Sequence, residues 1–253
     1  MLEIRNLSVS FGNRQVLRDV SFSLRPNRLT VMVGRNGSGK STLLSCVNQQ
    51  LPYSGSIFRG KDDLARMHPR ERAKAVAILP QFLPSPHITA REMVALGRNP
   101  WLDFTGRLTE TDKQAVEEAL RDADAADLAQ RYVDTLSGGE KQRVLLAMIL
   151  AQNTPIALLD EPTAHMDFGY EAEFLELLNK LKTERGKTFL VILHDLNQAV
   201  RYADDLMVLD GGRLVFCGSR EMCLDKQILE TTFGLRRCTL PEQGEDLIFF
   251  LPR

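Results

Sequence analysis

The sequence predicts an α/β fold: a core of mostly parallel strands, an N-terminal antiparallel β subdomain and an inserted α-helical subdomain. Three short apolar runs, at 156–159, 188–193 and 206–209, alternate with helical segments, which is the pattern of a parallel sheet. Residues 2–11 instead place apolar side chains at even spacing, as an antiparallel sheet does. From residue 84 to about 150 the strand signal is weak and helical spacing dominates, which indicates the insertion.

The N-terminal elements follow from turn residues and apolar spacing. Glycine and asparagine at 12–13 predict a turn after the first strand, and residues 20–24 alternate again. Residues 29–33 form a short apolar run that ends at Gly34, which indicates a buried strand. Segment 41–50 has helical spacing.

The insertion and the tail have their own signals. Segments 91–96 and 112–129 have helical spacing, and turn-forming residues at 99–101 separate them. Gln243 and Gly244 predict the turn of a small hairpin in the tail. We expect one domain over residues 1–253, and we assign its parts as core with antiparallel β subdomain 1–83, helical subdomain 84–150, core 151–237 and tail 238–253.

Composition narrows the class of protein. The 253 residues are 43% hydrophobic and 26% charged, and the formal net charge is -1, so we expect no nucleic-acid partner. No apolar run approaches the roughly 18 residues of a membrane helix, and the N-terminus lacks the layout of a secretory signal. Four scattered cysteines without metal-type spacing favour idle thiols in a reducing cytosol over disulfides. A cytoplasmic protein is therefore expected.

Residues 34–41, Gly-Arg-Asn-Gly-Ser-Gly-Lys-Ser, have the spacing of a phosphate-binding loop. Small residues let successive backbone N–H groups turn toward phosphate oxygens, and the helix that follows adds its positive end. Lys40 would reach the β and γ phosphates of a nucleotide, and the Ser41 hydroxyl would ligate Mg²⁺. The alternative is a chance glycine turn before a helix.

Two carboxylates follow the apolar run at 156–159. Asp160 ends the predicted strand, which places it to hold Mg²⁺ through a water. Glu161 comes next, where a carboxylate could orient and deprotonate an attacking water. In the alternative, Glu161 caps the next helix or forms an ion pair.

Together these segments resemble the ATP-binding-cassette (ABC) ATPases, and the resemblance covers nearly the whole chain. Residues 34–42 match the Walker A loop and residues 156–161 match the Walker B strand. Residues 136–140, Leu-Ser-Gly-Gly-Glu, match the family signature without a mismatch. Gln81 matches the glutamine loop, and His194 matches the switch histidine.

The resemblance implies the P-loop NTPase core of ABC ATPases, ATP hydrolysis, and a set of site residues. The implied catalytic residues are Glu161, His194 and Gln81. The implied Mg²⁺ ligands are Ser41, Gln81 and Asp160, the last through water. The implied contacts to ATP are Phe11, Gly34, Arg35, Asn36, Gly37, Ser38, Gly39, Lys40, Ser41, Thr42, Asp160, Ser137, Gly138, Gly139, Glu140 and Asp167.

Two of these roles rest mainly on the set of motifs. Phe11 falls where the family stacks an aromatic ring on adenine, but an aromatic side chain in a strand more commonly belongs to the core. His194 would contact the γ-phosphate and align Glu161, whereas a lone histidine after a strand is more commonly structural.

The signature implies a second copy of the chain. Residues 137–139 open a helix, so their backbone N–H groups form an anion site. In the ABC family this site meets the γ-phosphate held by the other protomer, so ATP would join two copies head to tail. Asp167 would cross that interface, after a stretch in which Met166 replaces the usual leucine. His165 either senses pH, contacts the partner or faces solvent.

Four further segments resemble the importers of iron chelates, haem and cobalamin, although less specifically than the nucleotide motifs. They lie at 70–81, 95–101, 167–170 and 218–234. They imply a motor subunit bound at the inner face of the membrane to polytopic permease subunits, which would dock around residues 82–98. A substrate-binding protein outside the cell would act with it indirectly. The alternatives are an ordinary structural role for Arg98 and Trp101, and a soluble ABC ATPase that remodels a protein complex without a permease.

Overall fold

The computed structural model describes residues 1–164, 166–241 and 247–252. The chain forms two compact units, of which one comprises Met1–Ala65 and Leu190–Arg253 and the other Arg66–Phe189. Strand β8, Thr188–Ile192, begins in the second unit and ends in the first. The two units are described separately below.

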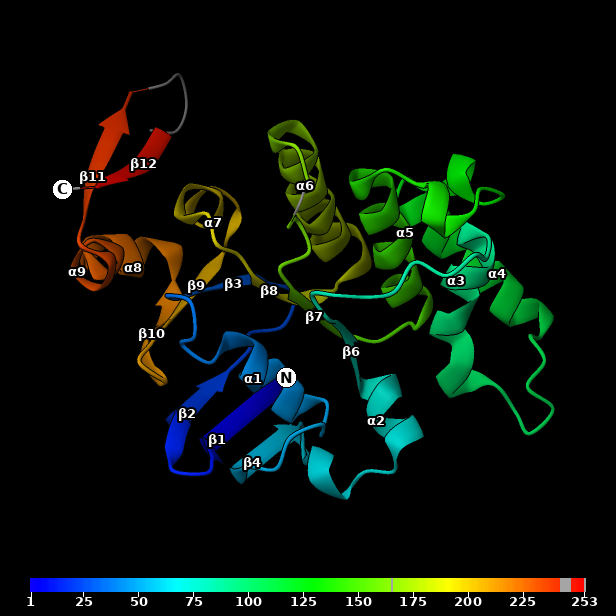
Figure 1. Ribbon diagram of the computed structural model, residues 1–253, viewed down its shortest axis with the longest axis horizontal. Coiled ribbons are helices and arrows are strands. Elements are labelled where there is room, and N and C mark those ends of the chain that lie inside the picture. The colour runs from blue at the N-terminus through cyan, green and yellow to red at the C-terminus, as the bar shows by residue number, and fades with distance from the viewer. Residues whose placement is uncertain (165, 242–246, 253) are drawn as a thin grey trace. The chain divides into compact units, whose positions relative to one another are not determined.

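An antiparallel sheet begins the first unit (Figure 1). Its strands run in the order β2-β1-β4-β5. Their bounds are β1 Leu2–Phe11, β2 Arg14–Ser23, β4 Ser54–Arg59 and β5 Asp62–Asp63. Leu2, Ile4, Leu7 and Val9 of β1 are buried, so the apolar spacing of this strand marks the face that packs on the core.

A second set of strands in this unit is almost entirely buried. Strand β3, Leu29–Val33, pairs in parallel with β9, Asp205–Asp210, and β10, Arg213–Ser219, is antiparallel to β9. Because both faces of β3 and β9 are covered, their sequences read as continuous apolar runs rather than as alternating ones. Helix α1, Lys40–Val47, follows β3, and α7, Leu196–Tyr202, precedes β9.

The C-terminal part of the first unit is a helix pair followed by a hairpin. Its helices are α8, Arg220–Asp225, and α9, Ile228–Phe233. Strands β11, Leu235–Leu240, and β12, Leu247–Pro252, pair antiparallel, which confirms the predicted tail hairpin. The turn predicted at Gln243 and Gly244 lies outside the described residues.

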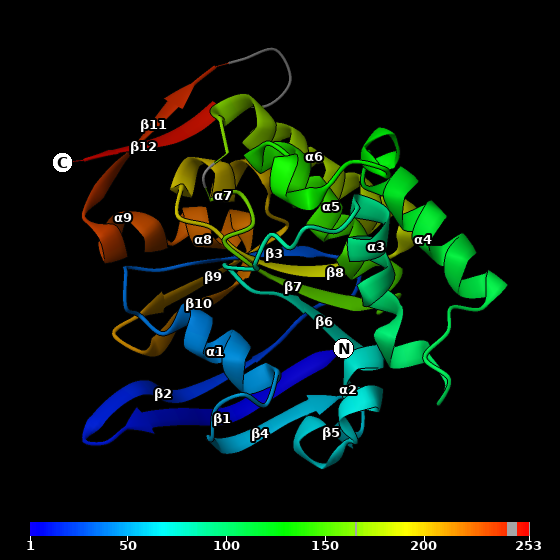
Figure 2. The same cartoon turned by 45° about the vertical axis from the view of Figure 1, so that its right-hand side comes forward.

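The second unit combines two parallel strands with helices. Strands β6, Val76–Leu79, and β7, Ile156–Asp160, are parallel neighbours. Helices α3, α4 and α5 pack against one another (Figure 2). The helical elements are η1 Leu64–Arg66 at the boundary, α2 Pro69–Ala75, α3 Ala90–Ala95, η2 Leu96–Trp101, α4 Glu110–Asp122, η3 Ala126–Leu128, η4 Val133–Thr135, α5 Gly138–Ala151 and α6 Phe168–Arg185.

Capping residues decide where three of these helices begin. Thr89, Thr109 and Ser137 each cap a helix through a reciprocal pair of hydrogen bonds with an acidic residue three positions later. The helix predicted at 112–129 therefore starts at Glu110 and ends at Asp122, because Asp124 takes a left-handed φ of 49°.

The predicted α/β class, with an N-terminal antiparallel sheet and mostly parallel core strands, is confirmed. The finer division at residues 83/84, 150/151 and 237/238 stays a prediction. None of the helices in the described ranges is both long enough and apolar enough to cross a bilayer.

Candidate nucleotide-binding and hydrolysis site

The predicted phosphate loop lies between β3 and α1 in the first unit. The loop turns tightly, with left-handed φ values of 75° at Gly37 and 103° at Gly39, and the Ser38 amide donates to the Arg35 carbonyl at 3.1 Å. Because the amides of a helix's first turn lack intrahelical acceptors, those at the start of α1 are donors for an anion.

Close packing makes this loop a cradle. A Cβ at Gly34 would stand 2.2 Å from the carbonyl oxygen of Leu209 in β9, so only glycine fits there. Lys40 is 6% exposed, and its ammonium donates to the carbonyls of Gly34 at 2.8 Å and Arg35 at 3.3 Å. The Ser38 hydroxyl is buried and has no hydrogen-bond partner among the described residues. A buried cation, an unused hydroxyl and clustered amides fit a polyphosphate.

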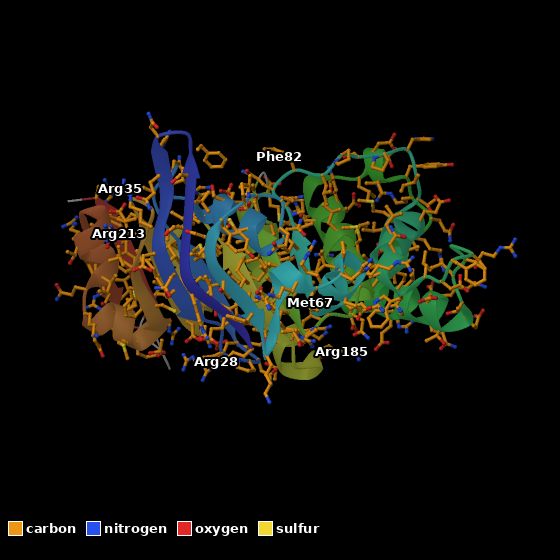
Figure 3. All side chains as sticks on the ribbon, turned by 90° about the horizontal axis from the view of Figure 1, so that it is seen from below. Arg28, Arg35, Met67, Phe82, Arg185 and Arg213 are labelled. Carbon is orange, nitrogen blue, oxygen red and sulfur yellow. The ribbon has the colours of Figure 1, made fainter. Side chains whose placement is uncertain are left out.

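The remaining residues of this loop have distinct positions. Asn36 is exposed, and Ser41 and Thr42 lie in the first turn of α1, where Ser41 is also exposed. Arg35, labelled in Figure 3, is exposed too, but its guanidinium donates to the carbonyl of Thr232 at 3.0 Å, at the end of α9. The Arg35 side chain is thus engaged by the C-terminal part of the first unit.

Phe11 ends β1 and is 51% exposed, so the alternative of a core side chain does not hold. Near it, the turn between β1 and β2, Gly37 and the glycines of the β9–β10 turn line a cavity of about 470 Å³. Arg14 and Arg18 are among its lining residues, so the cavity is polar and basic. Its volume is in the range of small-molecule sites, and it borders the phosphate loop.

His194 lies in the same unit, just after β8. The amide of Leu193 donates to the Met32 carbonyl at 3.2 Å, so the His194 segment lies against the end of β3, which leads into the phosphate loop. His194 is exposed. Asp195 caps α7, since its carboxylate accepts hydrogen bonds from the amides of Asn197 and Gln198.

The two carboxylates predicted from the sequence lie at the end of β7 in the second unit. Asp160 is the last residue of the strand and is 6% exposed. Glu161 follows with a φ of 50°, a left-handed conformation that is uncommon for glutamate and strained. The Gln81 amide nitrogen donates to Glu161 Oε2 at 2.5 Å. Since β6 and β7 are parallel neighbours, their carboxyl ends bring Gln81 and Glu161 together.

The signature opens α5 in this second unit. Ser137 is the N-cap, and its amide donates to Glu140 Oε2 at 2.8 Å. Arg131 donates to the other carboxylate oxygen of Glu140 at 2.5 Å. The hydrogen bond from the Ser137 backbone, aided by Arg131, holds the pKa of Glu140 below its ordinary value. The N-terminal end of a helix attracts anions, but the negative charge of Glu140 opposes this attraction at α5. Arg131 offsets that negative charge.

The start of α6 lies directly behind the signature. A Cβ at Gly139 would stand 3.3 Å from the ring of Tyr170, whereas Ser137 and Gly138 are exposed. Asp167 is the N-cap of α6, is exposed and makes no side-chain capping bond. His165 lies outside the described residues.

The predicted site residues thus divide between the units. The first unit carries Phe11, residues 34–42 and His194; the second carries Gln81, residues 137–140, Asp160, Glu161 and Asp167. Sequence reasoning missed Arg131, which neutralises Glu140, because no motif marks it. The oxygens of Ser41, Gln81 and Asp160 are the kind of ligand that Mg²⁺ prefers.

Arg98 corrects one expectation, because it cannot line a docking groove. It is 6% exposed, pairs with Asp112 at 2.9 Å and donates to the Ala151 carbonyl at 2.7 Å. Trp101 lies beside it and donates to the Gln152 carbonyl at 2.8 Å. Both side chains therefore hold the helical part of the second unit together.

Comparisons with known proteins identify the family of this chain. The family model described as ABC transporter matches residues 17–164. The achromobactin transport ATP-binding protein of Dickeya dadantii is 37% identical over 240 residues, which cover 94% of this chain and 89% of that protein. The ferric enterobactin transport ATP-binding protein of Escherichia coli is 36% identical over 251 residues, covering 98% and 93%.

A solved structure shares the fold over the whole chain. It shows an inward-facing conformation of an ABC transporter assigned to the metal-chelate type, with a TM-score of 0.86, 25% identity, and coverage of 100% of this chain and 97% of that one. The chain thus has a phosphate loop, a hydrogen-bonded pair of residues at strand ends and a capped helix at the signature. It also has relatives that match it over nearly its full length. The chain belongs to the ABC transporter family, as an ATP-binding subunit that hydrolyses ATP.

Proposed function

We propose that this ATPase is the motor of an importer for an iron chelate, haem, cobalamin or a related metal complex. The observation that carries the proposal is the similarity, over nearly its full length, to ATP-binding proteins whose names specify achromobactin and ferric enterobactin transport. ATP is the fuel, and the transported complex is the cargo of a separate permease.

The hydrolytic chemistry falls to residues at the ends of β3, β7 and β8. Loop amides and Lys40 would bind the phosphate chain, and Phe11 would stack on adenine. Ser41, Gln81 and Asp160 would hold Mg²⁺, which when bound neutralises developing negative charge on the phosphates. Glu161 would accept the proton of the attacking water, and His194 would contact the γ-phosphate.

The hydrogen bond between Gln81 and Glu161 suits a resting enzyme. While the Gln81 amide donates to Glu161 Oε2, it competes with a water for that oxygen. A ligand that drew the Gln81 side chain away would release the carboxylate. If ATP bound more tightly to the state in which Gln81 has moved, its binding would free Glu161 to act as the base.

A second copy of the chain would complete each site. The exposed start of α5 offers the backbone amide of Gly138 and the side-chain hydroxyl of Ser137 at a helix N-terminus. Asp167 is exposed near the same signature. We propose that these groups meet the γ-phosphate bound by the phosphate loop of the other chain, so that ATP closes a homodimer and hydrolysis opens it.

Docking to the permease would use the segment after Gln81. Phe82 is 74% exposed (Figure 3), and Leu96, at the end of α3, is 46% exposed. Large exposed apolar side chains are typical of protein-contact sites. The permease would hold the motor at the inner face of the membrane, and a binding protein outside would deliver the metal complex. The alternative, a soluble remodelling ATPase, needs no such surface.

Recovery of the permease from membranes tests this function. Affinity-tagged chain with Phe82 intact is expected to co-purify with a polytopic membrane protein, and Phe82→Asp should reduce the recovered amount about tenfold. Phe104→Asp is the matched control, because Phe104 is a 98% exposed phenylalanine in a loop away from this segment. Recovery of partners without membrane spans, unaffected by either change, would favour the remodelling alternative.

A further inference from the structure

The C-terminal segment of the first unit, segment 228–252 with its described residues 228–241 and 247–252, contacts two elements of the proposed site. This segment comprises α9, β11 and β12. One contact is with α7, the helix that follows His194, and the other is with the phosphate loop. Both contacts lie within one unit.

The contact with α7 is made by Asn197. Its side-chain oxygen accepts a hydrogen bond from the backbone amide of Phe250 in β12 at 2.8 Å. The Phe250 side chain is 7% exposed, so β12 is packed here rather than loosely apposed. Asn197 lies three residues after His194, and its own amide binds the capping carboxylate of Asp195 at 2.7 Å. One side chain thus joins the start of α7 to the C-terminal hairpin.

The contact with the phosphate loop is made by Arg35, whose guanidinium donates to the Thr232 carbonyl at 3.0 Å in the last turn of α9. The same segment is anchored through Arg237. This residue pairs with Glu230 at 3.3 Å and donates to the Leu224 carbonyl at 3.1 Å. Strand β11 of this segment is therefore anchored both to α9 and to α8, which precedes the segment.

The His194 segment needs such support because of its local structure. His194 lies on a short link before α7, which spans only Leu196–Tyr202. A helix of two turns is marginal by itself, so its position depends on tertiary contacts. Small displacements of a catalytic group reduce the rate strongly while binding of the nucleotide elsewhere persists.

We propose that Asn197 is a positioning residue for ATP hydrolysis. It ties α7, and through it His194, to the C-terminal hairpin, and the segment 228–252 holds the His194 segment and the phosphate loop in one arrangement. This inference rests on the role of His194 in the proposed function.

The test compares Asn197→Ala with Asn197→Asp, which keeps an oxygen acceptor for the Phe250 amide. In the full-length chain, Asn197→Ala is expected to lower kcat about 3- to 10-fold, the effect of one lost hydrogen bond. The Kd for ATP should stay within about twofold, because the Arg35 contact remains. Asn197→Asp should retain most of kcat. Since Asn197 is exposed, neither change threatens folding.

A structural readout separates positioning from a general loss of stability. Amide hydrogen exchange at residues 193–199 should rise in Asn197→Ala, stay near wild type in Asn197→Asp, and remain unchanged in β3 and β9. Wild-type kcat in Asn197→Ala, or an equal loss in both variants, would overturn the proposal, as would unchanged exchange at 193–199.

His194→Ala separates this inference from the function on which it rests. Loss of turnover in His194→Ala, with wild-type turnover in Asn197→Ala, would overturn the positioning role alone. Wild-type turnover in His194→Ala would overturn the proposed role of His194 and this inference with it. The expected result is loss of turnover in His194→Ala, a kcat lowered about 3- to 10-fold in Asn197→Ala, and most of kcat retained in Asn197→Asp.

Discussion

Glu161 shows at the scale of one residue how the site departs from ordinary structure. Its φ of 50° is strained for a residue with a side chain, and the strain directs its backbone out of β7. Its carboxylate accepts a hydrogen bond from the Gln81 amide at 2.5 Å. In the proposed function this carboxylate is the general base, and the Gln81 amide is a neutral partner that a water could replace.

Replacing Glu161 by glutamine should abolish turnover while preserving ATP binding. The amide cannot take a proton from water, so kcat should fall by at least about 100-fold. Steady-state phosphate release and equilibrium ATP binding measure the two effects. Glu184→Gln, an exposed carboxylate near the end of α6, serves as the control and should leave kcat unchanged. Wild-type turnover in Glu161→Gln would sink the assignment.

Single residues also show the limit of reading a site from sequence. Gln81, Glu161 and the signature were predicted because short motifs mark them. Arg131 and Lys141 were not, because their partners depend on the fold: Lys141 binds Ser85, 56 positions away. A lysine or arginine on a helix has no sequence signal that says which carbonyl or carboxylate it will meet.

At the scale of elements, the glutamine-loop segment, residues 81–89, is tied to the signature region of the same unit. Lys141, in the first turns of α5, donates to the Ser85 hydroxyl at 2.5 Å and to the Leu83 carbonyl at 3.3 Å. The amide of Val133 donates to the Ile88 carbonyl at 2.9 Å. We expect a displacement of Gln81 to be passed through these contacts to the helix whose start forms the signature.

Lys141→Met should weaken this tie. The methionine keeps the apolar stem of lysine but donates no hydrogen bond, so peptide 81–89 should exchange its amides faster, by about fivefold. Hydrogen–deuterium exchange followed by mass spectrometry measures it, with residues of α4 as the internal reference. Lys141→Arg, which keeps a cationic donor, should lie close to wild type. Equal exchange in all three proteins would contradict the tie.

Strands that are buried on both faces were predicted from the sequence more readily than short or half-exposed ones. Strands β3, β7, β8 and β9 are covered on both faces and read directly as apolar runs. Short or half-exposed strands such as β4 and β10 carry mixed sequences, so neither was predicted. The predicted helix 112–129 breaks at Asp124, where one left-handed residue ends it without any glycine or proline to signal the end.

For the whole molecule, the central claim is that ATP is shared between two chains. The phosphate loop and His194 belong to the first unit, and the signature belongs to the second. The start of α5 and Asp167 are exposed, so they could present this second half-site to a partner, as the proposed function requires. In a closed head-to-tail pair each nucleotide would contact one phosphate loop and one signature of the opposite chain.

Mixing two inactive variants tests this claim most directly. Lys40→Ala removes the phosphate-loop cation and Ser137→Arg blocks the signature, each introduced with Glu161→Gln so that bound ATP persists. With Mg-ATP, light scattering should find each variant alone as a monomer, whereas their mixture should form a dimer, because one intact shared site remains in the heterodimer. A mixture that stays monomeric, or dimerisation of either variant alone, would contradict the shared site.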